Sequence, residues 1–307
     1  MKIVLLDVLT FGETDLSVFK ELGEVEVYQT SSYEQTPTRI EDATVVVTNK
    51  VVLTKEFMQN AKRLKLICVA ATGMNNVDLE AAKELGIEVK NVAGYSTDSV
   101  IQHTFSMLFY LIGHSRYYDE VVKDGRYSQS PIFTDVSHPF FEVKGKKWGI
   151  IGLGSIGRGV AKIATAFGAE VSYYSTSGVE REEPYKHETL IELLEKCDII
   201  TIHAPLNEKT ENLLGYEELQ QCKEGAVILN LGRGGIIDED AVAKIIDERE
   251  LSFGLDVLTK EPMPQTHPLL HVKNSERLYI TPHIAWTSVE AREKLIASVA
   301  KNIESTL

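Results

Sequence analysis

The sequence predicts an α/β protein built from two doubly wound parallel sheets, with helices on both faces of each sheet. Three observations indicate this fold. Short apolar runs alternate with helical patterns in two separate series along the chain. The chain has 307 residues, enough for two domains of about 150 residues each. A glycine-rich turn, Gly152-Leu-Gly-Ser-Ile-Gly157, opens the second series between a predicted strand and a predicted helix.

The first series of elements runs from the N-terminus to about residue 95. Strands buried in a parallel sheet are near-continuous apolar runs, and helical stretches lie between these runs. Gly86 follows the third helical stretch and ends it. The predicted strands are residues 2–6, 24–28, 44–48, 64–70 and 87–91. The predicted helices are residues 15–22, 54–60 and 77–85.

One long helix is expected from residue 97 to about residue 123, followed by an irregular segment over residues 125–145. A loop of that length in a compact domain is usually functional or an interface. The second series starts at residue 147. Its predicted strands are residues 147–151, 170–174, 199–203, 227–231, 253–257 and 278–281. Its predicted helices are residues 156–167, 189–196, 216–221, 238–248 and 288–305.

The bulk properties exclude several functions. The formal net charge is −13, which argues against nucleic-acid binding because that needs Lys and Arg to displace counterions. No apolar run approaches the roughly 20 residues of a membrane span, and the short apolar start is a strand and not a signal peptide. Cys68, Cys197 and Cys222 show no CxxC spacing, so we expect buried thiols, no metal site and a cytoplasmic location.

Gly152, Gly154 and Gly157 form a fingerprint for a dinucleotide. The first glycine makes the tight turn, the second lets the backbone approach a pyrophosphate, and the third lets helix and strand pack closely. The N-terminus of the following helix faces the anion. An ordinary glycine-rich turn would share this composition, but the position between strand and helix favours the dinucleotide.

The end of the next predicted strand bears on the choice between NAD and NADP. An acid there would bind the ribose 2′-hydroxyl of NAD and repel the 2′-phosphate of NADP. Ser175 fills this position, followed by Thr176 and Ser177, and three hydroxyls could accept a phosphate. The nearest arginine is Arg181. The sequence therefore predicts NADP or NAD, with NADP used at least as well as NAD.

Three further segments place Arg233, Glu261 and His283 just beyond predicted strands, at the edge where open α/β sheets bind ligands. A guanidinium can hold a substrate carboxylate with paired donors. An imidazole can protonate a ketone oxygen, and a carboxylate on its second nitrogen fixes the tautomer and favours the charged ring. Each residue alone could be structural. Together, beside a nicotinamide, they are what the reduction of a 2-keto acid requires.

The chain resembles the D-isomer-specific 2-hydroxyacid dehydrogenase family over nearly its whole length. The matching segments are Gly152-Leu-Gly-Ser-Ile-Gly157, His203-Ala-Pro-Leu206, Asn230-Leu-Gly-Arg-Gly-Gly235, Gly254-Leu-Asp-Val257, Glu261-Pro262, Thr281-Pro-His283, Ala70-Ala-Thr-Gly-Met-Asn-Asn-Val-Asp78 and Gly94-Tyr-Ser-Thr-Asp-Ser-Val100.

This resemblance implies that Arg233, Glu261 and His283 are the catalytic trio, and that a homodimer forms through the long helix after residue 97. The substrate-binding residues it implies are Ala71, Thr72 and Gly73 through their backbone, together with Arg233, His283 and Trp286. Trp286 either walls the pocket near the reacting carbon or packs between domains. The implied cofactor-binding residues are Gly152, Gly154, Ser155, Ile156, Gly157, Ser175, Thr176, Ser177, His203, Ala204, Pro205, Leu231, Gly232 and Asp256, the last through the nicotinamide carboxamide.

Within the family, Thr281-Pro-His-Ile-Ala-Trp286 and Gly94-Tyr-Ser-Thr97 look most like the glycerate dehydrogenase, or hydroxypyruvate reductase, branch. The expected reaction interconverts a small 2-keto acid of hydroxypyruvate or glyoxylate type and its D-2-hydroxy acid. Ser175 departs from the usual acid, and no serine-binding regulatory module is expected after the last helix. The alternatives are a dinucleotide-sensing protein like the family's corepressors, which the intact trio disfavours, and a phosphite dehydrogenase.

The order of elements divides the chain into two domains with a cleft between them. Residues 1–95 plus 286–307 are expected to form a flavodoxin-like substrate domain, and residues 96–285 a Rossmann-type cofactor domain. The two crossings suggest a hinge whose closure expels water. The substrate carboxylate is expected between Arg233 and the backbone at Thr72 and Gly73.

Overall fold

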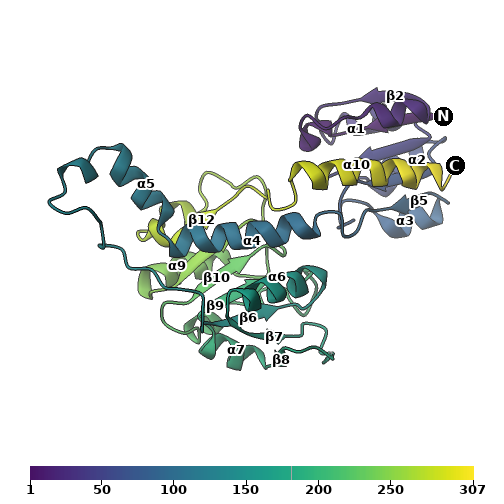
Figure 1. Ribbon diagram of the computed structural model, residues 1–307. Coiled ribbons are helices and arrows are strands. Elements are labelled where there is room, and N and C mark those ends of the chain that lie inside the picture. The colour runs from purple at the N-terminus through teal and green to yellow at the C-terminus, as the bar shows by residue number, and fades with distance from the viewer. Residues whose placement is uncertain (181) are drawn as a thin grey trace. The chain divides into compact units, whose positions relative to one another are not determined.

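The computed structural model describes residues 1–180 and 182–307. The chain divides into two compact units, one made of Met1–Ser96 with Trp286–Leu307 and the other of Thr97–Ala285. Figure 1 shows the C-terminal helix α10 (Val289–Glu304) lying among the N-terminal elements of the first unit. None of the described helices is both long and apolar enough to cross a membrane.

The first unit contains a five-stranded parallel sheet with the strand order β2-β1-β3-β4-β5. This order is the flavodoxin-like one, as expected. The central strands β1, β3 and β4 are nearly continuous runs of buried apolar residues, whereas the edge strands β2 and β5 are more exposed, and all five strands were predicted. Their bounds are β1 (Lys2–Leu5), β2 (Glu24–Val27), β3 (Val45–Thr48), β4 (Leu66–Val69) and β5 (Glu88–Lys90).

The helices of the first unit differ from the prediction at residues 15–22 and 36–40, and the 3-10 turn η1 (Val8–Phe11) was not predicted either. Residues 15–22 form only a 3-10 turn, Ser17–Glu21, because the Asp15 carboxylate accepts bonds from the backbone and hydroxyl of Ser17 and diverts the start of the segment. A helix at Thr36–Ile40 was not predicted. It forms although it contains Pro37, because this proline lies in the first turn, where proline is tolerated. The bounds are η1 (Val8–Phe11), η2 (Ser17–Glu21), α1 (Thr36–Ile40), α2 (Lys55–Asn60) and α3 (Leu79–Glu84).

The second unit contains a seven-stranded parallel sheet with the order β12-β11-β10-β9-β6-β7-β8. The chain reverses direction across the sheet between β6 and β9, which is the switch point where such sheets bind ligands. The short edge strand β8 was not predicted, because two residues carry no periodic pattern. The bounds are β6 (Lys147–Ile151), β7 (Glu170–Tyr174), β8 (Lys186–His187), β9 (Ile199–Ile202), β10 (Val227–Asn230), β11 (Ser252–Leu255) and β12 (Leu278–Ile280).

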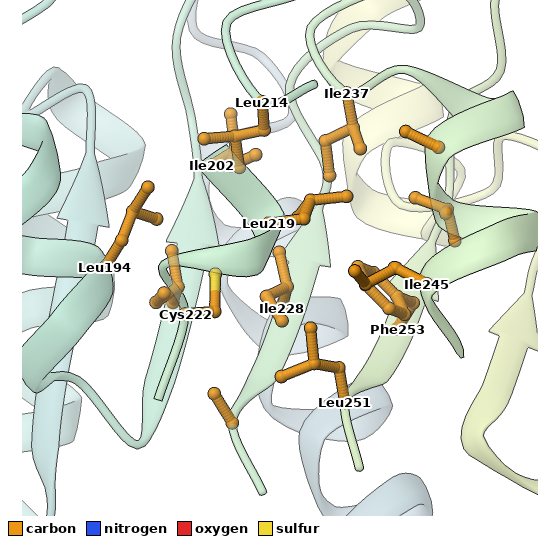
Figure 2. Packing of buried hydrophobic residues seen from close by; sticks show 14 of the residues in the cluster. Leu194, Ile202, Leu214, Leu219, Cys222, Ile228, Ile237, Ile245, Leu251 and Phe253 are labelled. Carbon is orange, nitrogen blue, oxygen red and sulfur yellow. The ribbon is translucent and has the colours of Figure 1, made fainter. Parts of the chain in front are cut away.

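Helices cover both faces of this sheet. On one face Leu194, Leu219 and Ile245, from three different helices, pack against strand residues such as Ile228 and Phe253 (Figure 2). On the other face α4 and α6 pack side by side over Trp148 and its neighbours. The bounds are α4 (Thr97–Ile112), α5 (Ser115–Lys123), η3 (Tyr127–Gln129), α6 (Ser155–Ala166), α7 (Leu190–Lys196), α8 (Tyr216–Gln220), α9 (Glu239–Glu248), η4 (Pro268–His271) and η5 (Ser275–Arg277).

The prediction of a single long helix over residues 97–123 is wrong. The chain breaks at Gly113 and at His114, whose φ of 46° lies in the left-handed region, and α5 starts in a new direction (Figure 1). A left-handed residue cannot continue a right-handed helix. The first half, α4, buries one side against its own sheet. The second half, α5, exposes Val122, and the segment after it exposes Phe133, Val136 and Phe140.

Candidate active site

The glycine turn after β6 has the geometry of a cradle for an anion. Gly152 has a φ of 93°, and a Cβ there would lie 2.9 Å from the amide nitrogen of Ala204. A Cβ on Gly157 would overlap the carbonyl oxygen of Gly152. A Cβ on Gly154 would instead meet no atom within 4 Å in residues 1–180 and 182–307. The first and third glycines are therefore needed for packing, and the second leaves space beside the first turn of α6.

A cavity of about 250 Å³ opens at this turn. Figure 1 places the turn where β6 passes into α6, at the middle of the seven-stranded sheet. The cavity is lined by Gly152, Leu153, Gly154, Tyr173, Ser175, Thr176, Ser177, His203, Pro205 and Asn207. The fingerprint, the hydroxyl run and the His203-Ala-Pro segment therefore meet at one site, although they lie far apart in the sequence.

His203 on the wall of this cavity is unusual. Part of the residue stays exposed, but both ring nitrogens are buried and have no hydrogen-bond partner among the described residues. Burial lowers the pKa of His203 to about 3, so the ring is neutral at physiological pH. A buried polar group without a protein partner is costly, and a bound ligand could satisfy it. Together with the open space at Gly154, this feature fits a dinucleotide.

A second cavity of about 550 Å³ adjoins the same strand end. Ser175, Thr176, His187 and the exposed Lys209 line it. The hydroxyl of Ser175 donates to the carbonyl of Val179 at 2.7 Å, so this serine already has a local role. Arg181, the arginine predicted to lie nearest, falls outside the described residues.

The turn that carries Arg233 is shaped by the side chain of Asn230, the last residue of β10. The Asn230 oxygen accepts the amide of Gly232 at 3.0 Å, and its nitrogen donates to the carbonyl of Arg233 at 2.8 Å. Arg233 itself is half-buried and donates to the carbonyl of Gly232. A Cβ on Gly234 would overlap the peptide between Leu258 and Thr259. The Arg233 turn therefore packs directly against the segment that leads to Glu261.

Glu261 and His283 form a close pair. The two residues follow β11 and β12, which are neighbours in the sheet. The Nδ1 atom of His283 lies 2.7 Å from Oε2 of Glu261, and both side chains are partly exposed. Oε1 of Glu261 accepts the amide of Leu258 at 2.9 Å. A carboxylate on Nδ1 leaves Nε2 of the ring for a substrate, which is the arrangement that proton transfer requires.

The backbone of His283 is held in the left-handed region, with a φ of 55°. Its amide lies 2.9 Å from the carbonyls of both Asp256 and Thr281. A non-glycine residue in this region costs free energy and usually marks a functional constraint. Here the strained backbone belongs to the residue whose imidazole contacts Glu261.

Asp256 is fully buried and organises the chain around His283. Its carboxylate accepts the hydroxyl of Thr281 at 2.6 Å and the amides of Ile284 and Ala285 at 2.8 and 3.0 Å. His103 of α4 lies 3.6 Å from the same carboxylate, and burial lowers the pKa of this histidine while Asp256 partly opposes the shift. These bonds give Asp256 a positioning role beside the predicted contact with the cofactor.

The predicted substrate-binding residues of the first unit follow β4. The Thr72 hydroxyl donates to the carbonyl of Val92 at 3.2 Å, and the Thr72 carbonyl accepts Asn91 at 2.6 Å. Trp286 is half-buried, with its ring edge-on to Tyr95 at 6.2 Å between centroids. The backbone role of Ala71, Thr72 and Gly73 stays a prediction.

Sequence reasoning missed His103, Lys209 and the side-chain role of Asn230. A polar residue that ends a buried strand just before a glycine turn is a typical turn former, so Asn230 could have been found. His103 and Lys209 offered no such signal, because each reaches its site from an element remote in sequence.

The fold and the cavity at the glycine turn define a dinucleotide-binding α/β protein whose sheet edge carries an arginine and a histidine–carboxylate pair. Residues 105–285 match the family described as D-isomer specific 2-hydroxyacid dehydrogenase, NAD binding domain. The chain belongs to this family, and the recognition from sequence motifs is confirmed. Relatives of this chain carry the names hydroxypyruvate reductase, glycerate dehydrogenase and glyoxylate reductase, which are consistent with an oxidoreductase of 2-keto and 2-hydroxy acids.

Individual relatives match nearly the whole chain. A putative 2-hydroxyacid dehydrogenase of Haemophilus influenzae is 39% identical, over 90% of this chain and 88% of the relative. A hydroxypyruvate reductase of Blautia hydrogenotrophica is 36% identical, over 100% of this chain and 97% of the relative. Among solved structures, an acyclic imino acid reductase in complex with NADPH and D-Arg has a TM-score of 0.87 and 30% identity, covering 99% of this chain and 96% of that one.

Proposed function

We propose that this protein reduces a small 2-keto acid of the hydroxypyruvate or glyoxylate type to its D-2-hydroxy acid, and catalyses the reverse reaction. The observation that carries the proposal is the His283–Glu261 pair at 2.7 Å, next to the Arg233 turn. The similarity to a protein named hydroxypyruvate reductase supports the choice of substrate class.

The residues present fit a nicotinamide dinucleotide at the glycine turn. Gly152, Gly154 and the first turn of α6 would hold its pyrophosphate, and the cavity beside Ser175 and His203 would hold its adenosine. When bound, the cofactor supplies the hydride.

Each member of the trio has a distinct task in this scheme. Arg233 would bind the substrate carboxylate with paired donors, which orients the keto group. His283 would donate its Nε2 proton to the keto oxygen as the hydroxyl forms, and would take it back in the reverse reaction. Glu261 would hold the ring through Nδ1 and stabilise its charged form.

Steady-state kinetics with hydroxypyruvate, glyoxylate and pyruvate, each with NADH and NADPH, test this function. We expect turnover with at least one of the first two acids. His283→Ala should lower turnover by about 10²-fold or more while cofactor binding is retained. Cofactor binding without turnover of any acid would favour the dinucleotide-sensing alternative, and oxidation of phosphite would favour a phosphite dehydrogenase.

We also propose that NADPH serves at least as well as NADH. Ser175, Thr176 and Ser177 offer no carboxylate to repel a 2′-phosphate, and Lys209 lines the same cavity as the first two. Glu188 lies in that cavity too, but Lys186 and Lys196 lie 2.9 and 3.5 Å from its carboxylate and offset its charge. A hundredfold preference for NADH under equal conditions would overturn this part of the proposal.

A homodimer and a cytoplasmic location complete the proposal. The segment after α5 exposes large apolar side chains, with Phe133 89% and Val136 75% exposed, and such patches mark association surfaces. The three cysteines are buried free thiols, in line with a reducing compartment. Light scattering should give a dimer, and Phe133→Ser should weaken it. A wild-type monomer, or a dimer unaffected by Phe133→Ser, would remove the support for this interface.

A further inference from the structure

The segment that carries Glu261 has little regular structure of its own. It runs from Asp256, just past β11, to His267, just before the 3-10 turn η4. Catalysis needs the Glu261 carboxylate to stay close to His283, because a displacement of about 1 Å can cost a large factor in rate. Contacts outside the segment must therefore hold it in place.

Glu239, the first residue of α9, contacts this segment on both sides of Glu261. Its Oε1 atom accepts the amide of Thr259 at 2.6 Å and the hydroxyl of the same residue at 2.8 Å. Its Oε2 atom lies 2.9 Å from Nε2 of His267. The Glu239 and His267 side chains are each only 10% exposed. One carboxylate thus fixes a point two residues before Glu261 and a point six residues after it.

The hydrogen bonds determine the tautomer of His267. The amide of Leu269 donates to Nδ1 of His267 at 3.3 Å, so this nitrogen carries a lone pair. The hydrogen of the neutral ring therefore sits on Nε2 and points at Glu239. A glutamine at position 239 that still accepts from Thr259 would turn its own NH₂ group toward this hydrogen.

The residue that Glu239 holds, Thr259, also packs against the turn that carries Arg233. The peptide between Leu258 and Thr259 fills the space that a side chain on Gly234 would need. The amide of Leu258 binds the Glu261 carboxylate. A displacement of Thr259 would therefore move both Glu261 and the turn that carries Arg233.

We propose that Glu239 and His267 are positioning residues for the His283–Glu261 pair, acting by clamping both sides of the segment that carries Glu261. The inference rests on the proposed reduction of a keto acid. It assigns a role in catalysis to two side chains that do not touch the reacting groups.

Glu239→Gln tests the proposal, with Glu248→Gln as the matched control. Glu248 lies on the same helix and, among the described residues, its side chain accepts a hydrogen bond only from the Tyr216 hydroxyl. We expect Glu239→Gln to lower kcat for keto-acid reduction about tenfold, with the KM of the cofactor within about twofold of wild type. The pH at which kcat falls to half its maximum should move to a lower value, because a displaced Glu261 holds the protonated ring less well. Glu248→Gln should change neither quantity.

A second pair of variants keeps the test decisive if Glu239→Gln folds poorly. His267→Gln retains a donor for Glu239 and should keep most of the activity, whereas His267→Phe removes it and should shift the pH profile. Folded variants with the wild-type kcat and pH profile, or a loss of melting temperature with an unmoved pH profile, would overturn the proposal. Absence of turnover in the wild type would instead overturn the proposed function.

Discussion

Nδ1 of His283 lies 2.7 Å from Oε2 of Glu261, and the two residues reach this contact from the ends of two adjacent strands. Parallel strands bring their carboxyl ends to one edge of a sheet, so residues 22 positions apart meet there. The left-handed backbone of His283 and its amide bonds to Asp256 and Thr281 complete the geometry.

Glu261→Gln should uncouple this pair without disturbing the cofactor site. An amide cannot stabilise the charged imidazole as a carboxylate does, so the protonated ring is lost at lower pH. We expect kcat for keto-acid reduction to fall by about 10²-fold at neutral pH, and its pH profile to shift to lower values. Cofactor affinity, measured by fluorescence titration, should stay at the wild-type value. An unshifted profile would contradict the role of Glu261.

Gly154→Ala should separate stability from cofactor binding. The new methyl group meets no atom of the described residues within 4 Å, so the free energy of unfolding should change by no more than about 1 kcal/mol. The methyl would occupy the space over the first turn of α6, and cofactor affinity should fall at least about tenfold. Gly234→Ala is the contrasting variant, and it should lower the free energy of unfolding, since its methyl would overlap the Leu258–Thr259 peptide. Undiminished cofactor affinity in Gly154→Ala would place the pyrophosphate elsewhere.

His203 should make the protein sensitive to acid. Burial lowers the pKa of His203 from 6.5 to about 3. Between these two pH values the imidazole is protonated in the unfolded chain and neutral in the folded chain. Stability is therefore unaffected above pH 6.5 and falls by about 1.4 kcal/mol for each pH unit below it. Denaturant unfolding at pH 7 and pH 5 should show a loss about 2 kcal/mol larger in the wild type than in His203→Gln. Equal losses would show that the imidazole is hydrated.

Lys209→Gln should discriminate between the two cofactors. Lys209 lines the cavity beside Ser175 and Thr176, where a 2′-phosphate would need a cation. We expect the KM for NADPH to rise about tenfold and the KM for NADH to stay unchanged. Lys244→Gln, on α9 with its amine over the ring of Tyr216, controls for the loss of one charge. Equal effects on both cofactors would contradict a phosphate subsite at Lys209.

Local patterns were sufficient for most of the fold. Two strands, Lys147–Ile151 and Glu170–Tyr174, have the predicted bounds, because runs of buried β-formers between turn residues carry their own signal. Prediction from these patterns failed where tertiary contacts or local polar contacts determine the secondary structure. The helix predicted to reach residue 123 breaks at His114, and the edge strand Lys186–His187 forms only by pairing with β7.

The sequence by itself predicted the two parallel sheets, the glycine turn and a candidate trio of Arg233, Glu261 and His283, because periodicity and motif order are local properties of the chain. Only the tertiary structure decided which side chains contact the segment that carries Glu261. Glu239 and Thr259 are 20 residues apart and Glu239 and His267 are 28 apart, so only the folded chain brings them together. The same holds for Lys209 beside Ser175 and for the buried nitrogens of His203, which have no partner in the part of the chain that the structure describes. Burial and proximity follow from packing between distant segments.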